Sequence, residues 1–383
     1  MKKGWQTKKL GEVCAFDKAQ GIHRHLPYVG LENIESHTAR FIGSTEAQPM
    51  KSSTFRFSSR HVLYGRLRPY LNKVLAPDFE GHCSTEIFPI KPCPELLREY
   101  LLYWFLADET VDRINETCTG ARMPRADMNE VLQFDFPVPP IPEQQRIVGI
   151  LDKAVEGIAT AKANVEKNLH NARAIFESHL QSVFTKHGDG WVKTTLGEAY
   201  DVRDGTHDSP KYHATGYPLV TSKNLKREGL SFDNVKLISE QDYKKINERS
   251  AVHKGDVLFA MIGTIGNPTL VNVEPKFAIK NVALFKIPSG NSGAFLKHYL
   301  DSGWVISKMM KEAKGTTQKF VGLGYLRGFS VNVPTITTQL EVVKKLDELA
   351  EETQHLESIY QRKIAALAAL KKSLLYQAFA GKL

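Results

Sequence analysis

Two long stretches of the chain carry apolar residues at alternating steps of four and three positions. The first stretch runs through Ile147, Leu151, Ala154, Ile158, Ala161, Val165, Leu169, Ala172, Phe176, Leu180 and Val183. The second runs through Val342, Leu346, Leu349, Thr353, Leu356, Tyr360, Ile364, Leu367, Lys371, Leu375 and Ala378. This spacing places the side chains on one narrow face of an α-helix. Each stretch covers about 40 residues, which predicts a helix of roughly 60 Å.

A single apolar face of that length needs a second helix to cover it. We therefore predict that the two helices pack against each other. Antiparallel packing would put one globular part at each end and give the chain a pseudo-two-fold axis. The alternative is that each helix packs on the globular part next to it. The residues expected to carry the seam between the helices and the docking of partners are Ile147, Leu151, Ile158, Val165, Leu346, Leu356, Ile364 and Leu367.

The segment that leads into each helix is also repeated. Residues 137–152 read PVPPIPEQQRIVGILD and residues 332–347 read NVPTITTQLEVVKKLD, so the two match at 7 of 16 positions. The prolines keep the first half of this joint extended, and Pro142 suits the first helical position, where its missing N–H is no loss. In the second copy, Thr338 followed by Glu341 has the spacing of a capping box. The same joint therefore starts a helix twice.

The rest of the chain is duplicated on the scale of whole domains. WQTKKLGEV at 5–13 returns as WVKTTLGEA at 191–199. Further matches follow in the same order: Asn33-Ile34 with Asn224-Leu225, Val62-Leu63-Tyr64 with Val257-Leu258-Phe259, Phe88-Pro89-Ile90 with Phe285-Lys286-Ile287, Gly120 with Gly315, and Phe134 with Phe329. The predicted parts are a first domain at 1–141, a central helix at 142–186, a second domain at 187–336 and a C-terminal helix at 337–383.

Each globular part is predicted to be mixed α/β. Short β-rich runs at 60–64, 256–262 and 282–287 are punctuated by Gly, Pro and Asn, as strands are. Residues 95–115 and 293–314 have the length and apolar spacing of helices. The predicted fold class is therefore α+β, with two mixed α/β domains joined by two long antiparallel helices.

Composition narrows the class of protein only slightly. The 383 residues are 42% hydrophobic and 24% charged, as in globular domains, and the formal net charge of +9 modestly favours a polyanionic partner. The four cysteines, Cys14, Cys83, Cys93 and Cys118, show no CxxC spacing, so we expect buried free thiols rather than a zinc site or disulfides. No run approaches the ~18 apolar residues of a membrane span, and the first residues lack an apolar leader, so we expect a cytoplasmic protein.

Three features together resemble one known family. The joint PVPPIPEQQRIVGILD, the opening WxxxxLGE and the two-copy layout resemble the specificity (S) subunits of Type I restriction–modification systems, over essentially the whole chain. In that family, two target-recognition domains are joined by two antiparallel helices, and each domain reads one half of a bipartite DNA site. The second joint departs from the family pattern, because Thr337 and Thr338 replace Pro142 and Glu143.

The resemblance implies a non-catalytic DNA-recognition subunit. Its partners would be double-stranded DNA, two adenine-N6 methyltransferase (modification) subunits docked on the helices, and motor–nuclease (restriction) subunits. The chain itself would hold no cofactor, since S-adenosylmethionine would belong to the methyltransferase, and ATP and Mg to the motor–nuclease. The helices would set the gap between the half-sites, and the non-identical repeats imply an asymmetric site. The specificity chain of a Type IIB-like restriction–modification enzyme is an alternative with the same architecture.

Basic residues of the first repeat concentrate between residues 47 and 77, where no acidic residue occurs. GRLRPYLNK at 65–73 is the densest part. As a strand it would put Arg66 and Arg68 on one face with Tyr64 and Tyr70, suited to phosphates or guanine edges. The alternative for this segment is a solvated basic face. TGARMPRAD at 119–127 is a second candidate, as a rigid loop that reaches DNA, and its alternative is a pair of charges in a linker. The candidate DNA-binding residues are Arg56, Arg60, Arg66, Arg68, Tyr70, Lys73, Arg122 and Arg125.

Polar, turn-rich loops supply the candidates of the second repeat. These are DGTHDSPKYH at 204–213, TSKNLKR at 221–227 and KGTTQK at 314–319, together with a lysine at 280 that stands between apolar residues. KGTTQK occupies the place that TGARMP has in the first repeat. The candidate DNA-binding residues here are His207, Lys211, Tyr212, Lys223, Lys226, Lys280, Thr316 and Lys319.

No catalytic motif accompanies these residues. FVGLG at 320–324 imitates the FxGxG loop of methyl-donor sites, but the Asn/Asp-Pro-Pro-Tyr/Phe motif of adenine methyltransferases does not occur. The chain contains no GxxxxGKS/T phosphate loop, and its 13 histidines form no HxxxH or HExxH cluster. Two rival classes are a self-sufficient methyltransferase and a coiled-coil scaffold with no role on DNA.

Overall fold

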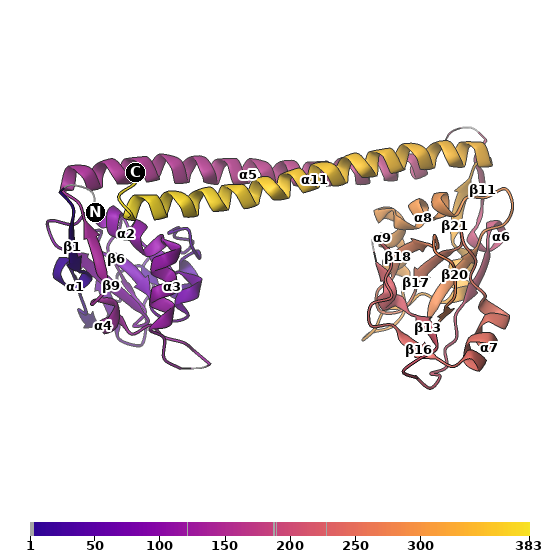
Figure 1. The fold of residues 1–383 in the computed structure, drawn as a ribbon, viewed down its shortest axis with the longest axis horizontal. Coiled ribbons are helices and arrows are strands. Elements are labelled where there is room, and N and C mark those ends of the chain that lie inside the picture. The colour runs from indigo at the N-terminus through magenta and orange to yellow at the C-terminus, as the bar shows by residue number, and fades with distance from the viewer. Residues whose placement is uncertain (1–3, 121, 187, 189, 227) are drawn as a thin grey trace. The chain divides into compact units, whose positions relative to one another are not determined.

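The protein folds into two compact units, and each contains one of the sequence repeats. The computed structural model describes residues 4–120, 122–186, 188, 190–226 and 228–383. Unit 1 holds the chain up to Glu166 together with Gln361–Leu383, and unit 2 is Lys167–Tyr360. The long helices α5 (Ile141–Thr185) and α11 (Ile336–Phe379) each contribute to both units (Figure 1). Each unit therefore contains a globular domain and part of both helices.

Domain 1, the globular part of unit 1, is built on two four-stranded sheets. Their strand orders are β2-β9-β6-β7 and β3-β5-β8-β4, and a separate antiparallel pair joins β1 to β10. The elements are β1 (Gln6–Lys9), α1 (Leu10–Val13), β2 (Cys14–Phe16), β3 (Gln20–Gly21), β4 (Tyr28–Val29), η1 (Leu31–Asn33), β5 (Thr54–Phe57), β6 (Val62–Gly65), η2 (Pro69–Leu71), β7 (Val74–Leu75), β8 (Gly81–Cys83), β9 (Ile87–Pro92), α2 (Arg98–Leu106), α3 (Asp108–Glu116), α4 (Met128–Val131) and β10 (Asp135–Val138).

Strand β6 lies at the centre of the domain 1 core. Its four residues, VLYG, are all buried, as expected for a short apolar run covered on both faces. The ring of Tyr64 stacks on Phe105 of α2, with 4.7 Å between the ring centroids. Trp104 of the same helix meets Phe136 edge-on at 5.1 Å. Aromatic side chains of α2 thus contact both β6 and β10.

Domain 2 repeats this plan with small differences. Its main sheet has the order β12-β20-β17-β18, beside a three-stranded sheet β16-β13-β19 and the pairs β14-β15 and β11-β21. The elements are β11 (Val192–Thr195), α6 (Leu196–Ala199), β12 (Asp201–Asp204), β13 (Tyr217–Val220), η3 (Ser222–Asn224), β14 (Leu225–Lys226), β15 (Gly229–Leu230), β16 (Lys236–Ile238), α7 (Glu240–Ser250), β17 (Val257–Ala260), β18 (Gly266–Leu270), β19 (Ala278–Ile279), β20 (Val282–Lys286), α8 (Gly293–Asp301), α9 (Gly303–Glu312), α10 (Leu323–Gly328) and β21 (Ser330–Val333).

Equivalent backbone hydrogen bonds occur within each of the two domains. The Leu10 N–H donates to the carbonyl of Phe134 at 2.9 Å, and the Leu196 N–H donates to the carbonyl of Phe329 at 2.8 Å. Both leucines belong to the repeated LGE motif, and both are fully buried. The predicted duplication, and with it the predicted fold class, is confirmed.

One alignment that we made from the sequence is shifted by two residues. In the ladders, Val62 lies opposite Ile90, and its counterpart Val257 lies opposite Phe285. Phe285 therefore corresponds to Ile90 and not to Phe88. An F-x-I pattern occurs at 88–90 and again at 285–287, so the sequence comparison matched the wrong phenylalanine, and the strand register gives the correct pairing.

Each predicted domain helix is in fact two helices. Residues 95–115 contain α2 and α3, separated at Ala107, and residues 293–314 contain α8 and α9, separated at Ser302. Both separating residues have extended backbone, with ψ of 129° and 132°. Apolar spacing did not reveal the break, because it continues on both sides of it.

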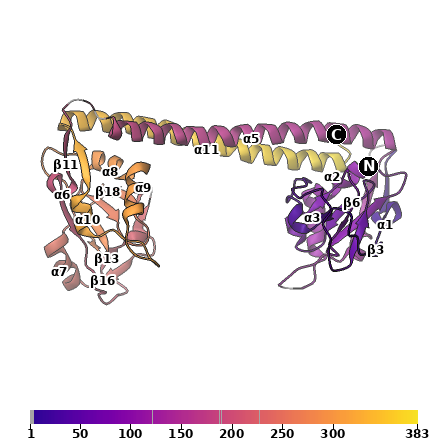
Figure 2. The same cartoon turned by 180° about the vertical axis from the view of Figure 1, so that it is seen from behind.

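The two long helices pair in antiparallel fashion. In unit 1, Nη2 of Arg146 near the start of α5 donates to the carbonyl of Leu383, just beyond the end of α11, at 2.7 Å. In unit 2, Arg173 in the second half of α5 forms an ion pair of 3.0 Å with Glu357 in the first half of α11. Figures 1 and 2 show the two helices side by side. The helix pairing predicted from the seam is confirmed.

Burial along α5 follows the predicted spacing. Ile147 and Leu151 near its start and Leu180 near its end are fully buried. Ile158 and Val165, farther along, are half-buried. A two-helix seam between two well-packed ends gives this pattern, because a single partner helix covers only part of each side chain.

Burial along α11 departs from the prediction at one position. Leu346 is fully buried, and Ile364 and Leu367 are half-buried, as a seam requires. Leu356, which we assigned to the seam, is 41% exposed. Its neighbour Glu357 is mostly covered instead, because it pairs with Arg173 of α5. At this turn an ion pair replaces the expected apolar contact.

The core of domain 1 is completed by both long helices. Ile147 and Leu151 from the start of α5 share one apolar cluster with Leu375 and Ala378 from the end of α11. Phe379 adds a ring contact with Tyr100 of α2 at 5.2 Å. The alternative that each helix packs on its own domain is therefore partly right, since the helices contact each other and the domain as well.

The core of domain 2 is completed in the same way. Leu346 from the start of α11 lies in one cluster with Leu180 and Phe184 from the end of α5. The ring of Phe184 meets Phe295 and Tyr299 of α8 edge-on, at 5.4 Å from each. In both units, the helix that follows one domain in sequence helps to close the core of the other.

A buried glutamine fixes the joint between domain 1 and α5. Oε1 of Gln144 accepts a hydrogen bond from the Leu97 N–H at 2.8 Å. Its Nε2 donates to the carbonyls of Glu95 at 2.9 Å and Pro139 at 2.8 Å. The side chain is fully buried and has all its hydrogen-bonding groups engaged, which explains why the joint contains a polar residue here.

The same amide returns at the second joint. Oε1 of Gln339 accepts from the Ser292 N–H at 2.9 Å, and its Nε2 donates to the Pro334 carbonyl at 2.9 Å.

The predicted capping box at Thr338 is wrong. The helix begins earlier, at Ile336, and Thr335 precedes it, with its Oγ1 accepting from the Thr338 N–H at 3.5 Å.

The aspartate that ends each joint is also engaged by its own domain. The Tyr103 hydroxyl donates to Asp152 at 2.6 Å, and Nε2 of His298 lies 2.8 Å from Asp347. Burial lowers the pKa of the His298 imidazole, and Asp347 opposes that shift. The equivalent aspartate is thus contacted by a tyrosine in domain 1 and by a histidine in domain 2.

The four cysteines are free: Cys14 and Cys83 are buried, whereas Cys93 and Cys118 are half-buried. Burial raises the pKa of the Cys14 thiol to about 12, so this thiol stays protonated. In the part of the chain that the structure describes, no helix combines the length and apolarity needed to cross a membrane.

We predict that Gln144→Leu destabilises unit 1 strongly. The substitution keeps the size of the side chain but leaves the Leu97 N–H and two carbonyls buried without partners. Since each such group costs about 1–3 kcal/mol, we expect a loss of roughly 3 kcal/mol in the free energy of unfolding, measured by urea titration. Gln145→Leu, at the exposed next position, is the matched control and should change stability by less than about 0.5 kcal/mol. Equal losses in both variants would contradict the role of the buried amide.

We also predict that His298→Tyr flattens the pH dependence of stability. The pKa of His298 is lower in the folded protein than in the unfolded chain, so its contribution is present above the unfolded pKa and is lost as pH falls through the folded pKa. Thermal unfolding between about pH 5 and 8 should therefore show a smaller acid loss in the variant. Tyr103→His, the reciprocal change in domain 1, should add an acid loss. If neither variant changed the pH dependence of thermal stability, the prediction would be contradicted.

Candidate nucleic-acid interface

The structure brings together two basic segments of domain 1 that are far apart in sequence. The Arg68 N–H donates to the Pro124 carbonyl at 2.8 Å, and the Ala126 N–H donates to the Arg66 carbonyl at 2.9 Å. Within the second segment, Thr119 and Arg125 exchange backbone hydrogen bonds of 3.1 and 3.0 Å. The hairpin 119–125, apart from its undescribed residue 121, is therefore fastened to the turn that follows β6.

A single carboxylate holds the two arginines of this surface. Glu86, in the turn before β9, accepts from Nε of Arg66 at 3.0 Å and from Nε of Arg125 at 3.0 Å. The Arg66 guanidinium also lies over the ring of Phe88, 5.4 Å from its centroid. The side chains of Arg66, Arg125 and Glu86 are 34%, 39% and 23% exposed. They form a preformed polar group open to solvent, which we call the Arg–Glu cluster.

The segment GRLRPYLNK is not the strand we predicted. Strand β6 ends at Gly65, and Arg68 has a positive φ of 52° that turns the chain into the short helix η2. The ring of Tyr64 points into the core, where burial raises the pKa of its phenol, so it is unavailable to a ligand. Tyr70 lies in η2 and is 47% exposed. The arginines and Tyr70 gather at a turn rather than along a strand face.

The other candidates of domain 1 have different surroundings. Arg56 on β5 pairs with Glu80, Nε to Oε1 at 2.8 Å, on an exposed face. Lys73 donates its ammonium to the carbonyl of Ile34, so it serves a structural contact. Arg60 and Arg122 are exposed. The charge excess that the sequence showed is thus partly balanced by acids from outside the basic stretch.

One group of candidates in domain 2 gathers around a buried aspartate. His207 lies between Asp204, 2.9 Å from its Nε2, and Asn281, 2.8 Å from its Nδ1. Arg249 of α7 also pairs with Asp204. Nζ of Lys280 donates to Ser209 Oγ at 2.6 Å, on the same loop. His207 is therefore fixed in orientation while its ring stays exposed.

The remaining candidates of domain 2 are exposed on short loops. Lys211 and Tyr212 follow His207 on its loop, and Lys223 and Lys226 lie in η3 and β14. Thr316 and Lys319 lie in the hairpin 314–320. This hairpin is attached to the turn after β17, where the Gly263 N–H donates to the Lys319 carbonyl at 2.8 Å. That hairpin is the counterpart of 119–125 in domain 1.

The sequence did not point to Glu86, although it organises the surface of domain 1. It lies 20 positions from Arg66 and 39 from Arg125, so no local pattern connects them. Asn281 of domain 2 was missed for the same reason, because it lies 74 positions from His207. Only the pairing of β6 with β9, which the sequence does not define, brings Glu86 to Arg66.

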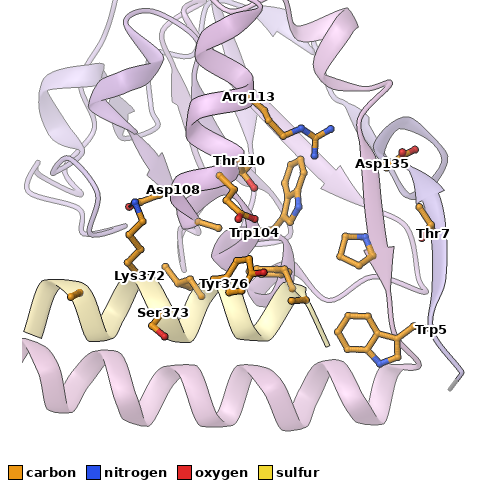
Figure 3. Close-up of a pocket in the computed structure, with 17 residues that line it drawn as sticks. Trp5, Thr7, Trp104, Asp108, Thr110, Arg113, Asp135, Lys372, Ser373 and Tyr376 are labelled. Atoms are coloured by element: carbon orange, nitrogen blue, oxygen red, sulfur yellow. Dashed lines mark ion pairs between the residues drawn. The ribbon is translucent and has the colours of Figure 1, made fainter. Parts of the chain in front are cut away.

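A cavity of about 690 Å³ lies within unit 1, between domain 1 and the end of α11 (Figure 3). Its wall combines aromatic side chains, among them Trp5, Trp104 and Tyr376, with aliphatic and charged ones. At its rim, Lys372 of α11 forms an ion pair with Asp108 of α3 at 3.1 Å. This ion pair joins α11 to the domain. Among the described residues, no group of three or more His, Cys, Asp or Glu is arranged to hold a metal ion.

The comparisons with known proteins agree with this architecture. The sequence matches the family described as "Type I restriction modification DNA specificity domain" twice, over residues 2–169 and 188–364. The two matches include both repeats and most of the chain. The chain therefore belongs to this family of DNA specificity domains.

Curated relatives carry the same description. The chain is 28% identical over 189 residues to the Type I restriction enzyme EcoDI specificity subunit of Escherichia coli, which is 48% of this chain and 41% of that protein. It is 20% identical over 346 residues to the StySPI specificity subunit of Salmonella potsdam, covering 79% and 69% of the two chains. The chain thus spans only about two fifths of the EcoDI subunit.

Solved structures show the same fold over the full length. A chain from work on complex assembly and conformational transition of the type I R-M system superimposes with a TM-score of 0.83 at 21% identity, covering 100% of this chain and 99% of that chain. The HsdS subunit from Thermoanaerobacter tengcongensis gives a TM-score of 0.67 at 20% identity, with 100% and 98% covered. At these identities the likeness establishes the fold.

Proposed function

We propose that this protein is the DNA specificity subunit of a Type I restriction–modification enzyme. Each globular domain reads one half of an asymmetric bipartite site, and the paired helices set the gap between the halves. The observation that carries the proposal is a common backbone frame that presents different side chains in the two domains. Family membership and the curated relatives support it.

The candidate surfaces have the chemistry that DNA recognition uses. Arginine, lysine, tyrosine and threonine side chains on loops held by a rigid scaffold suit both phosphate anchoring and base reading. The Arg–Glu cluster, the exposed Tyr70 and Arg122 form the proposed reading surface of domain 1. In domain 2 the proposed surface includes His207, the lysines of its loops and the hairpin 314–320.

The proposed partners follow from the role. Two adenine-N6 methyltransferase subunits dock on the two long helices, and motor–nuclease subunits join them to make a restriction enzyme. S-adenosylmethionine, ATP and Mg serve those partners, and this chain selects the sequence without catalysing a step. We place the complex in the cytoplasm, where the DNA it protects or cleaves is found.

The experiment that tests this function uses the chain co-purified with its methyltransferase subunits. Incubation with labelled methyl donor and a DNA library should methylate adenines in one bipartite sequence, whereas the chain alone should methylate nothing. Binding of the complex should also weaken as salt rises, because phosphate contacts release counterions. Methylation by the isolated chain, or retention of all sequences equally by the complex, would contradict the proposal.

We predict that inserting four residues into both helices lengthens the gap in the target without altering the half-sites. Four residues add ~6 Å of helix, which corresponds to ~2 base pairs at 3.4 Å each. The insertions belong between residues 166 and 167 and between 360 and 361, away from both domain cores. The new target is read from methylated adenines by single-molecule sequencing.

The control for that prediction is an insertion in one helix only. It shifts the apolar face of one helix against the other, so the complex should lose activity. An unchanged gap after the double insertion would show that the helices do not set the spacing.

A further inference from the structure

The Arg–Glu cluster leaves the end of one arginine free for a ligand. Glu86 engages Arg66 only through Nε, by the bond of 3.0 Å, whereas it engages Arg125 through Nε and also Nη2, at 3.0 Å each. Within the described residues, the two terminal Nη groups of Arg66 make no hydrogen bond to the protein. The Arg66 side chain is one-third exposed, and its guanidinium lies over the ring of Phe88. The free edge of this guanidinium is the face that pairs with two acceptors at once.

The nature of the acceptors follows from the charge beside Arg66. A carboxylate at 3.0 Å from Nε repels a phosphate that approaches the same guanidinium. It has little effect on a neutral pair of acceptors such as O6 and N7 of guanine, which is the most frequent base contact of arginine. The ion pair and the Phe88 ring also restrict the rotamers of Arg66 before binding, so less entropy is lost when the contact forms.

Domain 2 has the same backbone at this place but other side chains. The Val321 N–H donates to the Met261 carbonyl at 2.9 Å, as Ala126 does to Arg66 in domain 1. Lys314 and Phe320 exchange hydrogen bonds of 3.0 and 2.9 Å, as Thr119 and Arg125 do. The positive φ of Arg68 is repeated at its counterpart, Gly263, with φ of 77°.

The side chains at these equivalent positions differ completely in chemistry. Arg66 corresponds to Met261, which is 4% exposed and carries no donor. Arg125 corresponds to Phe320, which is 39% exposed. Glu86 corresponds by strand register to Asn281, whose amide oxygen lies at His207. Domain 2 therefore offers an apolar, aromatic surface where domain 1 offers an oriented guanidinium.

We propose that Glu86 is a positioning residue that sets Arg66 to read a guanine in the half-site of domain 1, and that domain 2 makes no such contact at its equivalent position. The proposal rests on the proposed function and adds the class of base and the residue that orients the reader. It predicts that one half-site contains a guanine whose recognition requires Arg66, and that Met261 supplies no such recognition in the other half-site.

The test uses the complex of this chain with its methyltransferase subunits, once the target has been mapped. Each guanine of both half-sites is replaced in turn by 7-deazaguanine, which lacks the N7 acceptor but keeps its base pairing. Binding is measured at fixed salt for the unmodified protein and for Glu86→Gln, Arg66→Ala and Lys9→Ala. Lys9 serves as the matched control, because it is also paired with a carboxylate, that of Asp135, on the surface of domain 1 and is not a candidate DNA-binding residue.

We expect one guanine, in one half-site, whose replacement weakens binding of the unmodified protein about tenfold. Arg66→Ala should abolish that discrimination, and Glu86→Gln should reduce it several-fold, with no change in the other half-site. Lys9→Ala should keep the discrimination in full. A purely structural role for Glu86 would instead lower binding to every duplex by the same factor.

The inference would be overturned if no guanine in either half-site proved sensitive to the replacement, or if the discrimination survived Arg66→Ala. It would also be overturned if Glu86→Gln weakened binding to all duplexes by the same factor. In each of these cases the complex still selects a bipartite sequence, so the proposed function stands. Loss of all sequence preference in the unmodified complex would overturn the function itself, and the inference with it.

Discussion

Neither domain closes its apolar core without side chains from both long helices. Leu375 and Ala378, which lie at the end of the second helix, are buried in the first domain beside Ile147 and Leu151. The reciprocal contact places Leu180 and Phe184 in the second domain. Because these contacts join residues far apart in sequence, a large loop must be closed before they form, which makes folding slow but ties each helix at both ends. Buried Gln144 and Gln339 then set the direction in which each helix leaves its own domain.

This arrangement separates the scaffold from the residues that vary. The hairpins 119–125 and 314–320 are fastened by matching backbone hydrogen bonds, which do not depend on the side chains. Arg125 and Phe320 can therefore occupy the same place without a change of fold. A protein that reads two different half-sites needs this property, because base reading depends on side chains while spacing depends on the frame.

Much of the fold could be predicted because its signals are local. A spacing of three and four along 40 or so residues defines a helix and its contact face, and repeated LGE and proline-rich segments define the duplication. The breaks at Ala107 and Ser302 left no trace in the apolar pattern, and the start of α11 was misplaced because Thr335 and Thr338 are both plausible caps. The basic stretch of domain 1 was found, but its partners were not. Glu86 and Glu80 reach it through strand pairing, a long-range property that spacing along the chain does not encode.

The central claim is that the end of α11 is part of the domain 1 core, and native-state hydrogen exchange tests it most directly. If the claim is right, the amides of residues 366–379 and those of β6 and β9 exchange with the same free energy, because they open together as one cooperative unit. The claim would be contradicted if the amides at the end of α11 exchanged almost as fast as unprotected amides while those of β6 and β9 remained protected.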